Sequence, residues 1–141
     1  MSVQAVLKEM LVPCDPKYLV EVREMVRQVC QASGLEERQG LLFSLAVDEA
    51  VTSILTNACD MGHRGELKVV IDVDETRFRA LIEDHTNHLL VDMSNEAAYM
   101  AHLNRERRHQ LAVFLMRKIM DEVNYSYKKG YQNDLQLVKF L

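Results

Sequence analysis

The sequence contains no tryptophan and only two prolines and five glycines, and its three cysteines lie far apart. Cys14, Cys30 and Cys59 form no C-x-x-C pair, so neither a metal clip nor a disulfide framework is indicated. We therefore expect reduced cysteines that pack in the interior. Few glycines and prolines, together with 48% hydrophobic residues, also argue against a disordered or repetitive chain.

Long hydrophobic runs and an excess of positive charge are missing as well. No stretch approaches the roughly 20 apolar residues that cross a bilayer, and residues 1–7 have neither the charged start nor the apolar run of an export signal. The net charge is −4, so the chain lacks the broad basic surface that grips a phosphate backbone. We expect a cytoplasmic protein that binds neither a membrane nor nucleic acid directly.

The 141 residues contain segments of two periodicities. Apolar residues at alternate positions predict strands, and apolar residues three or four positions apart predict helices. Asp15-Pro16 is a typical helix start, and Ser33-Gly34 is a typical helix end. In order, the predicted elements are a strand at 3–12, helices at 16–33 and 36–58, strands at 66–73 and 77–84, a helix from 111 to about 121, and strands at 123–127 and 134–140.

Paired strands with helices between them, without regular strand–helix alternation, predict an α/β (α+β) two-layer sandwich. Its sheet should be mixed and mainly antiparallel, with the helices packed on one face. The helix at 36–58 has apolar residues on nearly every side, so we expect little of it to be solvated. We expect one domain, residues 1–141, in which the irregular segment at 85–109 is lid-like.

Three polar residues recur one turn apart inside the apolar helix at 36–58. Glu49, Ser53 and Asn57 lie at i, i+4 and i+8, which places them along one stripe that would face one cavity. Asp84 ends the predicted strand at 77–84 and would mark a second corner of that cavity. From the residues alone, a structural role for Glu49 is the more common outcome, and Asp84 is a common type of turn residue.

Two segments carry a family resemblance: LAVDEAVT at 45–52, and LMRKIMDEV at 115–123, which precedes the closing hairpin with its Leu-Val-Lys at 137–139. With the predicted order of elements, they closely resemble the anti-sigma factor serine kinases. Those kinases belong to the Bergerat-fold (GHKL, histidine-kinase-like) ATPases, alongside histidine kinases, gyrase and Hsp90. The resemblance covers essentially the full chain, and it implies the histidine-kinase-like ATPase fold.

In the first nucleotide box of these kinases, a Glu is followed four residues later by an Asn that binds Mg²⁺. The resemblance implies that Glu49 is the catalytic base, and it places Ser53 at the metal-binding Asn position. A serine hydroxyl can also ligate Mg²⁺, although its side chain is shorter than that of asparagine. Asn57 lies where the family often has His or Asn, and it is a further candidate for cofactor binding.

The second and third boxes depart further from the family. Where the kinases have Asp-x-Gly-x-Gly, with the Asp accepting from the adenine amino group, residues 84–88 read DHTNH, which keeps Asp84 and lacks both glycines. Where they have Gly-x-Gly-Leu, a turn that binds phosphate through backbone N–H groups, residues 108–111 read RHQL. Arg105 and Arg108 are then candidates for holding phosphate by side-chain charge, or they belong to a solvated charge run.

The resemblance implies two alternative functions. In the one we favour, the chain is an anti-sigma-factor-like regulator that binds a sigma factor or a STAS-domain anti-anti-sigma protein, and its ATP site is degenerate. In the other, it is an active serine protein kinase that phosphorylates the anti-anti-sigma protein, with Glu49 as base and Mg²⁺ with ATP/ADP as cofactor. In the family the first strand and helix support a homodimer and partner contacts. We therefore expect an interface within residues 3–33, with candidate contacts at Lys17, Glu21, Arg23, Glu24 and Arg27.

Overall fold

The computed structural model describes residues 3–60, 65–84, 111–127 and 133–141, and within these it leaves the side chains of 56–60, 125–127 and 133 undescribed. Residues 111–119 are helical and are called the 111–119 helix below. The other elements, in chain order, are β1 (Val6–Pro13), the 3-10 turn η1 (Pro16–Tyr18), α1 (Leu19–Ser33), α2 (Glu37–Asp60), β2 (Glu66–Val73), β3 (Arg77–Asp84), β4 (Glu122–Tyr127) and β5 (Asn133–Phe140).

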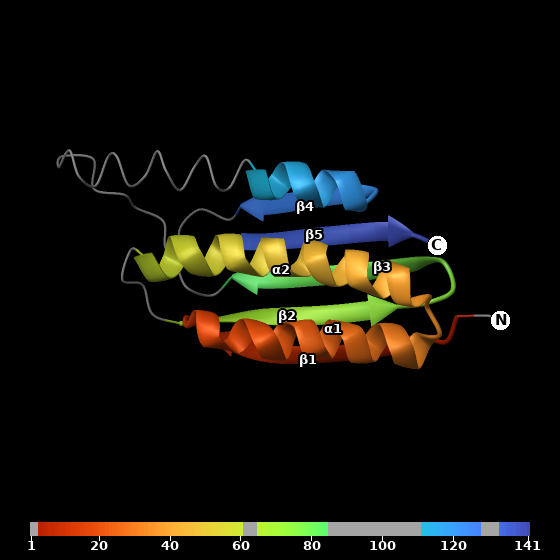
Figure 1. Ribbon diagram of the computed structural model, residues 1–141. Helices are drawn as coiled ribbons and strands as arrows, with labels where there is room; N and C mark the ends of the chain where they lie inside the picture. Colours follow the sequence, from red (N-terminus) through yellow and green to blue (C-terminus); the bar gives the residue numbers. More distant parts are fainter. Residues whose placement is uncertain (1–2, 61–64, 85–110, 128–132) are drawn as a thin grey trace.

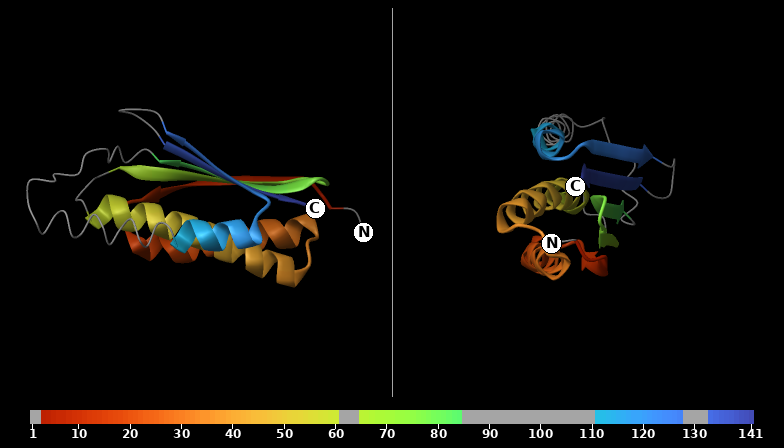
Figure 2. Two further views of the ribbon diagram at one scale, coloured as in Figure 1. Left: turned by 90° about the horizontal axis from the view of Figure 1, so that it is seen from above. Right: turned by 90° about the vertical axis from the view of Figure 1, so that its right-hand side faces the viewer.

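The strands form one five-stranded sheet in the order β1-β2-β3-β5-β4, and every described pair is antiparallel. α1, α2 and the 111–119 helix lie side by side as a single layer on one face of this sheet (Figures 1 and 2). The predicted two-layer α/β sandwich with helices on one face is confirmed. The expected mixed sheet is fully antiparallel over the described strands.

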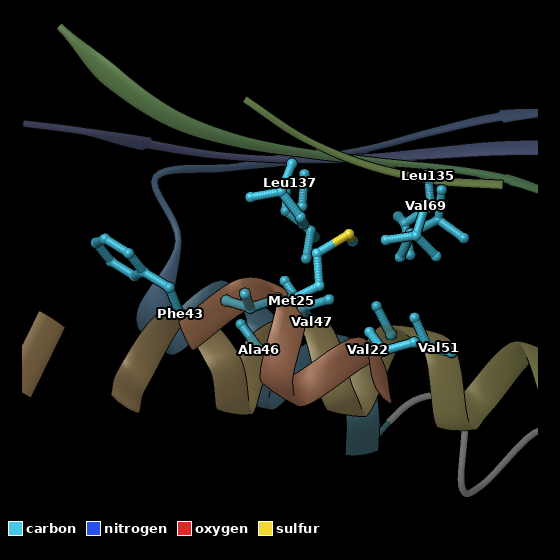
Figure 3. Packing of buried hydrophobic residues seen from close by; sticks show 14 of the residues in the cluster. Val22, Met25, Phe43, Ala46, Val47, Val51, Val69, Leu135 and Leu137 are labelled. Atoms are coloured by element: carbon cyan, nitrogen blue, oxygen red, sulfur yellow. The ribbon is translucent and has the colours of Figure 1, made fainter. Parts of the chain in front are cut away.

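Alternation along the strands explains why only one face of the sheet is covered. In β3, Phe78, Ala80 and Ile82 are fully buried, whereas Arg77 and Arg79, which alternate with them along the strand, are half-buried. Successive strand residues point to opposite faces, so the apolar set packs against the helices and the arginines lie on the open face. Figure 3 shows the resulting core between sheet and helices, with side chains of α1, α2, β2 and β5 meeting in one cluster.

Local hydrogen bonds fix both ends of α1. The Asp15 carboxylate accepts from the Lys17 backbone N–H at 3.0 Å, and the first turn is the 3-10 segment η1, so α1 itself begins three residues later than predicted. At the other end Gly34 has φ +86°, and the N–H of Leu35 donates to the Cys30 carbonyl at 3.0 Å. A left-handed glycine with this bond ends the helix and lets the chain reverse into α2.

Two carboxylates hold the turns that complete the sheet. Asp74, between β2 and β3, accepts from the Thr76 hydroxyl at 2.7 Å and from two backbone N–H groups. Asp121, just after the 111–119 helix, accepts from the Phe140 backbone N–H at 2.7 Å. These bonds favour the ionised carboxylates, so they hold the pKa of Asp74 and of Asp121 below its ordinary value. Asp121 thereby fastens the end of the helix to the last strand.

The cysteines differ from the prediction in one respect. Cys14 is disulfide-bonded, so the expectation of reduced cysteines is wrong for this residue. Cys30 is a free, buried thiol, and burial raises its pKa to about 11. It therefore stays protonated and chemically quiet at neutral pH. The side chain of Cys59 lies outside the described residues.

The prediction that α2 has little solvated surface is wrong for its N-terminal half. Leu41, Leu42 and Leu45 are exposed there, while Phe43, Ala46 and Val47 are buried between them. Burial along α2 thus follows one side of the helix, although apolar residues occur all round it. Within the part of the chain that is described, no helix combines the length and apolar character needed to span a membrane.

An ion pair joins α1 and α2, which follow each other in the sequence. The Arg23 guanidinium on α1 donates to both carboxylate oxygens of Asp48 on α2, at 2.8 Å and 3.4 Å. A two-point contact of this kind resists rotation of one helix against the other. It also means that Arg23, predicted as an exposed partner contact, is already engaged within the molecule.

The packing of Phe43 on Phe78 yields a first prediction. Their ring centroids lie 4.6 Å apart, and this contact joins α2 to β3. Phe43→Leu and Phe78→Leu should each lower the free energy of unfolding by about 1–3 kcal/mol. The double variant should cost less than the sum of the two by about 0.5–1.5 kcal/mol, because the ring–ring term is lost only once. Urea unfolding followed by circular dichroism measures this, with the exposed Phe140→Leu as control; simple additivity would contradict the contact.

A second prediction concerns the ion pair between α1 and α2. The Arg23 and Asp48 side chains are 51% and 20% exposed, so a double-mutant cycle with alanine should give a coupling of only about 0.2–1 kcal/mol, which shrinks as salt is added. The Glu24–Arg27 pair within α1 is the matched control, because it spans one turn of a single helix and should couple more weakly. Equal coupling energies in both cycles would mean that the pair between the helices stabilises the fold no more than a pair within one helix.

Candidate functional site

The centre of α2 carries the polar stripe predicted from the sequence. Glu49 and Ser53 are both half-buried and lie four residues apart on the helix. Between and beside them Ala50, Val51 and Ile54 are buried in the core. The two polar side chains therefore occupy the border of the buried side of α2, where a carboxylate and a hydroxyl are accessible without being fully solvated.

The rotation of α2 decides where this stripe points. Asp48 is directed toward α1, as its contact with Arg23 shows. Glu49 lies about 100° further around the helix, so it is turned away from α1. Since α2 lies between α1 and the 111–119 helix, the stripe borders the side of α2 that the 111–119 helix flanks (Figures 1 and 2).

Asp84 is the buried carboxylate of the described residues, with 1% of its surface exposed. It ends β3 and is paired across the sheet with Leu67 of β2 and Asn133 of β5. It has the same strand parity as Phe78, Ala80 and Ile82, so it faces the helix layer rather than the open side of the sheet. The end of β3 and the C-terminal half of α2 lie at the same end of the molecule (Figure 1).

The remaining predicted site residues are only partly placed. Asn57 lies on α2 one turn beyond Ser53, but its side chain is not described. Arg105 and Arg108, and the residues after Asp84 where the family has glycines, fall within 85–110, outside the described residues. The structure thus positions Glu49 and Ser53 on α2 with Asp84 on β3 at the corresponding end of the sheet.

The chemistry of the described set is that of oxygen donors. Glu49 and Ser53 offer a carboxylate and a hydroxyl one helical turn apart, the donor types that Mg²⁺ prefers. Asp84 offers a buried carboxylate of the kind that binds an amino-group donor. No group of three or more His, Cys, Asp or Glu that could hold a metal ion occurs in the part of the chain that is described.

Sequence reasoning missed the ion pair between α1 and α2. From the sequence, Asp48 is placed only in the motif around Glu49, and Arg23 is predicted as an exposed partner contact. A signal was present, because Arg23 directly follows Val22 at the border of the apolar side of α1. Such a position is next to the neighbouring helix, but the spacing along the chain does not reveal which residue it will pair with.

Comparison with known proteins gives three findings. The family model described as histidine kinase-like ATPase domain matches residues 12–139. The serine-protein kinase RsbW of Bacillus velezensis is 26% identical over 132 residues, an alignment that covers 86% of this chain and 79% of that protein. A chain in the crystal structure of the SiaB–SiaC complex from Pseudomonas aeruginosa superimposes with a TM-score of 0.67 at 15% identity, covering 93% of this chain and 88% of that one.

The three findings agree with the architecture. The structural likeness, at its low identity, supports the fold alone, and the fold it supports is the two-layer sandwich described above. The family match spans the sheet and the helices from the end of β1 to the end of β5. The family resemblance drawn from LAVDEAVT and LMRKIMDEV is confirmed: the chain belongs to the histidine kinase-like ATPase domain family.

Proposed function

We propose that this protein is an anti-sigma-type regulator that acts in the cytoplasm by binding a protein partner, while its nucleotide site is degenerate. The partner is a sigma factor or a STAS-domain anti-anti-sigma protein. Residues 1–141 would form one domain, with 85–109 as its lid-like segment. The observation that carries the proposal is that residues at the nucleotide-binding positions, Ser53 first among them, differ from those the related kinases use.

The serine at position 53 affects how well the site could coordinate Mg²⁺. The related kinases place an asparagine carbonyl oxygen at this position, and a serine oxygen lies closer to the helix backbone. Mg²⁺ demands near-ideal octahedral geometry at about 2.0–2.1 Å, so a ligand set back toward the helix is not an equivalent replacement. The half-buried position of Ser53 beside the buried Ile54 leaves little freedom for α2 to move toward the ion.

The missing glycines affect how closely the backbone could approach the nucleotide. Thr86 and His88 stand at the two glycine positions of the adenine box, and Arg108 and Gln110 stand at the two glycine positions of the phosphate turn. A Cβ atom penalises positive φ by about 1 kcal/mol or more and keeps the backbone away from a ligand. The substitutions in these two boxes and at the metal position affect the same ligand, so together they argue against ordinary kinase activity.

Partner binding is supported from two sides. A related protein carries the name serine-protein kinase, and the superimposed chain comes from a complex of two proteins. In this molecule β1 is an edge strand with one side unpaired within the described sheet, as a strand-mediated homodimer needs. Glu21, Glu24 and Arg27 are exposed on α1, and Lys17 is exposed on η1 just before it. The expected interface within residues 3–33 therefore remains our proposal.

The alternative is an active serine kinase, and the retained carboxylates Glu49 and Asp84 favour it. Glu49 would accept the proton of the partner's serine hydroxyl as its oxygen attacks the γ-phosphorus of ATP, and ADP would leave. Asp84 would hold the adenine amino group. This mechanism requires Mg²⁺ to neutralise the phosphates, which is the role for which Ser53 is least suited.

Nucleotide binding separates the two functions and is our third prediction. Millimolar ATP or ADP with Mg²⁺ should leave the melting temperature unchanged in a thermal-shift scan. A functional site filled at 100 times its Kd would instead raise the free energy of unfolding by about 2.7 kcal/mol, which is several degrees. A clear Mg²⁺-dependent shift would favour the kinase.

Ser53→Asn tests the metal position in the same scan, with Thr52→Asn as a matched control one residue off the stripe. If Ser53 is the weak point, the first variant should gain a Mg²⁺-dependent shift and the second should not. Identical behaviour of both variants would mean that the metal site is not built around this position.

Our fourth prediction concerns the partner. A purified STAS-domain protein or sigma factor from the same cell should bind with the same Kd in the presence and absence of Mg·ATP, as measured by calorimetry. Phosphate-affinity electrophoresis should show no phosphoserine on the STAS protein. Binding by neither candidate would contradict the proposal, whereas phosphorylation abolished by Glu49→Gln would establish the alternative.

A further inference from the structure

Large apolar side chains are exposed on two neighbouring helices of the helix layer. Leu41, Leu42 and Leu45 of α2 are 65%, 42% and 45% exposed, and Phe114 of the 111–119 helix is 55% exposed. We call these four residues the leucine patch. Scattered single apolar residues on a surface need no explanation, but a group of large ones on neighbouring elements indicates a binding surface.

Packing on the inner side of α2 fixes the direction of the patch. Phe43, Ala46 and Val47 point from α2 into the core beneath the sheet (Figure 3). With 3.6 residues per turn, Leu41 and Leu45 must then face away from the sheet. α2 and the 111–119 helix lie side by side (Figures 1 and 2), so the exposed Phe114 belongs to the helix next to the leucines.

The neighbouring outer side of α1 has a different character. It carries charged residues, including the ion pair between Glu24 and Arg27, and its large exposed apolar residue is Val20. Leu7 and Leu11 of β1 and Phe140 of β5 are also exposed, but they belong to the sheet. Within the helix layer, the larger exposed apolar surface is therefore that of α2 and the 111–119 helix. It lies apart from the predicted interface on β1 and α1.

Positively charged side chains border the leucine patch. Arg38 lies one turn before the leucines, and Lys118 lies over the ring of Phe114 with its Nζ 5.2 Å from the ring centroid. Arg117 follows on the same helix. Among the described residues none of these three cations has an ion-pair partner, whereas Arg23, Arg27 and Arg79 all do. The acidic residues Glu36 and Glu37 lie at one end of the patch, at the turn from α1, and Glu49 is half-buried at its border.

We propose that the leucine patch is the docking surface for an acidic amphipathic helix of a partner protein. Leucines of such a helix would cover the patch and remove its apolar surface from water, which favours binding. Its flanking carboxylates would pair with Arg38 and Lys118, which otherwise would be desolvated without a counter-charge. A second copy of this chain fits less well, because it would bring the same cations to the interface.

The inference goes beyond the proposed function, because it names a surface and a partner chemistry that need no nucleotide site and no contact with β1. Our fifth prediction therefore uses a synthetic probe: a fluorescent helical peptide with leucines at i, i+3, i+4 and i+7 and glutamates on both flanks. Fluorescence anisotropy should show saturable binding to the wild-type protein. The same peptide with lysines in place of the glutamates should bind at least about tenfold more weakly, and added salt should weaken the acidic peptide.

Variants locate the binding. Leu45→Glu should weaken the acidic peptide at least about tenfold, since it places a carboxylate in the centre of the patch. Val20→Glu is the matched control, because Val20 is 66% exposed on α1 outside the patch, and it should leave binding unchanged. Both substitutions lie on exposed helix positions, and circular dichroism checks that both variants fold.

Three results would overturn the proposal: no binding, equal binding of acidic and basic peptides, or equal loss in both variants. A wild-type dimer that Leu45→Glu converts to a monomer in sedimentation velocity would also overturn it, in favour of a second copy as the occupant. These readouts are independent of nucleotide and of the sigma-factor or STAS titration. Failure here therefore differs from failure of the proposed function.

Discussion

The burial of one side of α2 against the sheet is the constraint on which the other features depend. Val47 and Val51 have no exposed surface, and Phe43 packs on Phe78, so α2 cannot rotate without opening the core. Every other residue of α2 inherits its direction from this packing. Asp48 meets α1, Glu49 and Ser53 border the opposite side, and the leucines are left in solvent.

The sheet places the second half of the site by the same logic. Antiparallel pairing of β3 with β2 and β5 puts Asp84 at the end of three adjoining strands, and strand parity turns it toward the helices. A shift of one residue in this register would move Asp84 to the open face and expose Phe78. Stability of the core and orientation of the candidate site are therefore set by one register.

Patterns with a physical period were predictable from the sequence, and contacts between distant segments were not. Alternating apolar and polar residues predict the hairpin at 66–84. Gly34 predicts the end of α1, because glycine adopts a left-handed φ without steric cost. The exposure of Leu41 and Leu45 could not be predicted, because a helix with apolar residues on every side does not indicate which side the sheet will cover. The Arg23–Asp48 pair and the bonded state of Cys14 depend on which segments meet in space, which spacing along the chain does not reveal.

The order of the strands has a consequence for how the chain can fold. β2 and β3 are neighbours in sequence, and so are α1 and α2, so these two hairpins close over short loops. β1 pairs with β2 only after the whole α1–α2 hairpin has been enclosed, with Val6 opposite Val73. The entropy of closing a loop grows with its length, so the local hairpins are favoured to form early and the two outer parts of the sheet to add later. On its side of the sheet, the edge strand β1 is therefore held by the pairing that spans the most sequence, its pairing with β2. Because α1 and α2 lie between these two strands in the sequence, β1 is expected to pair only once both helices have formed.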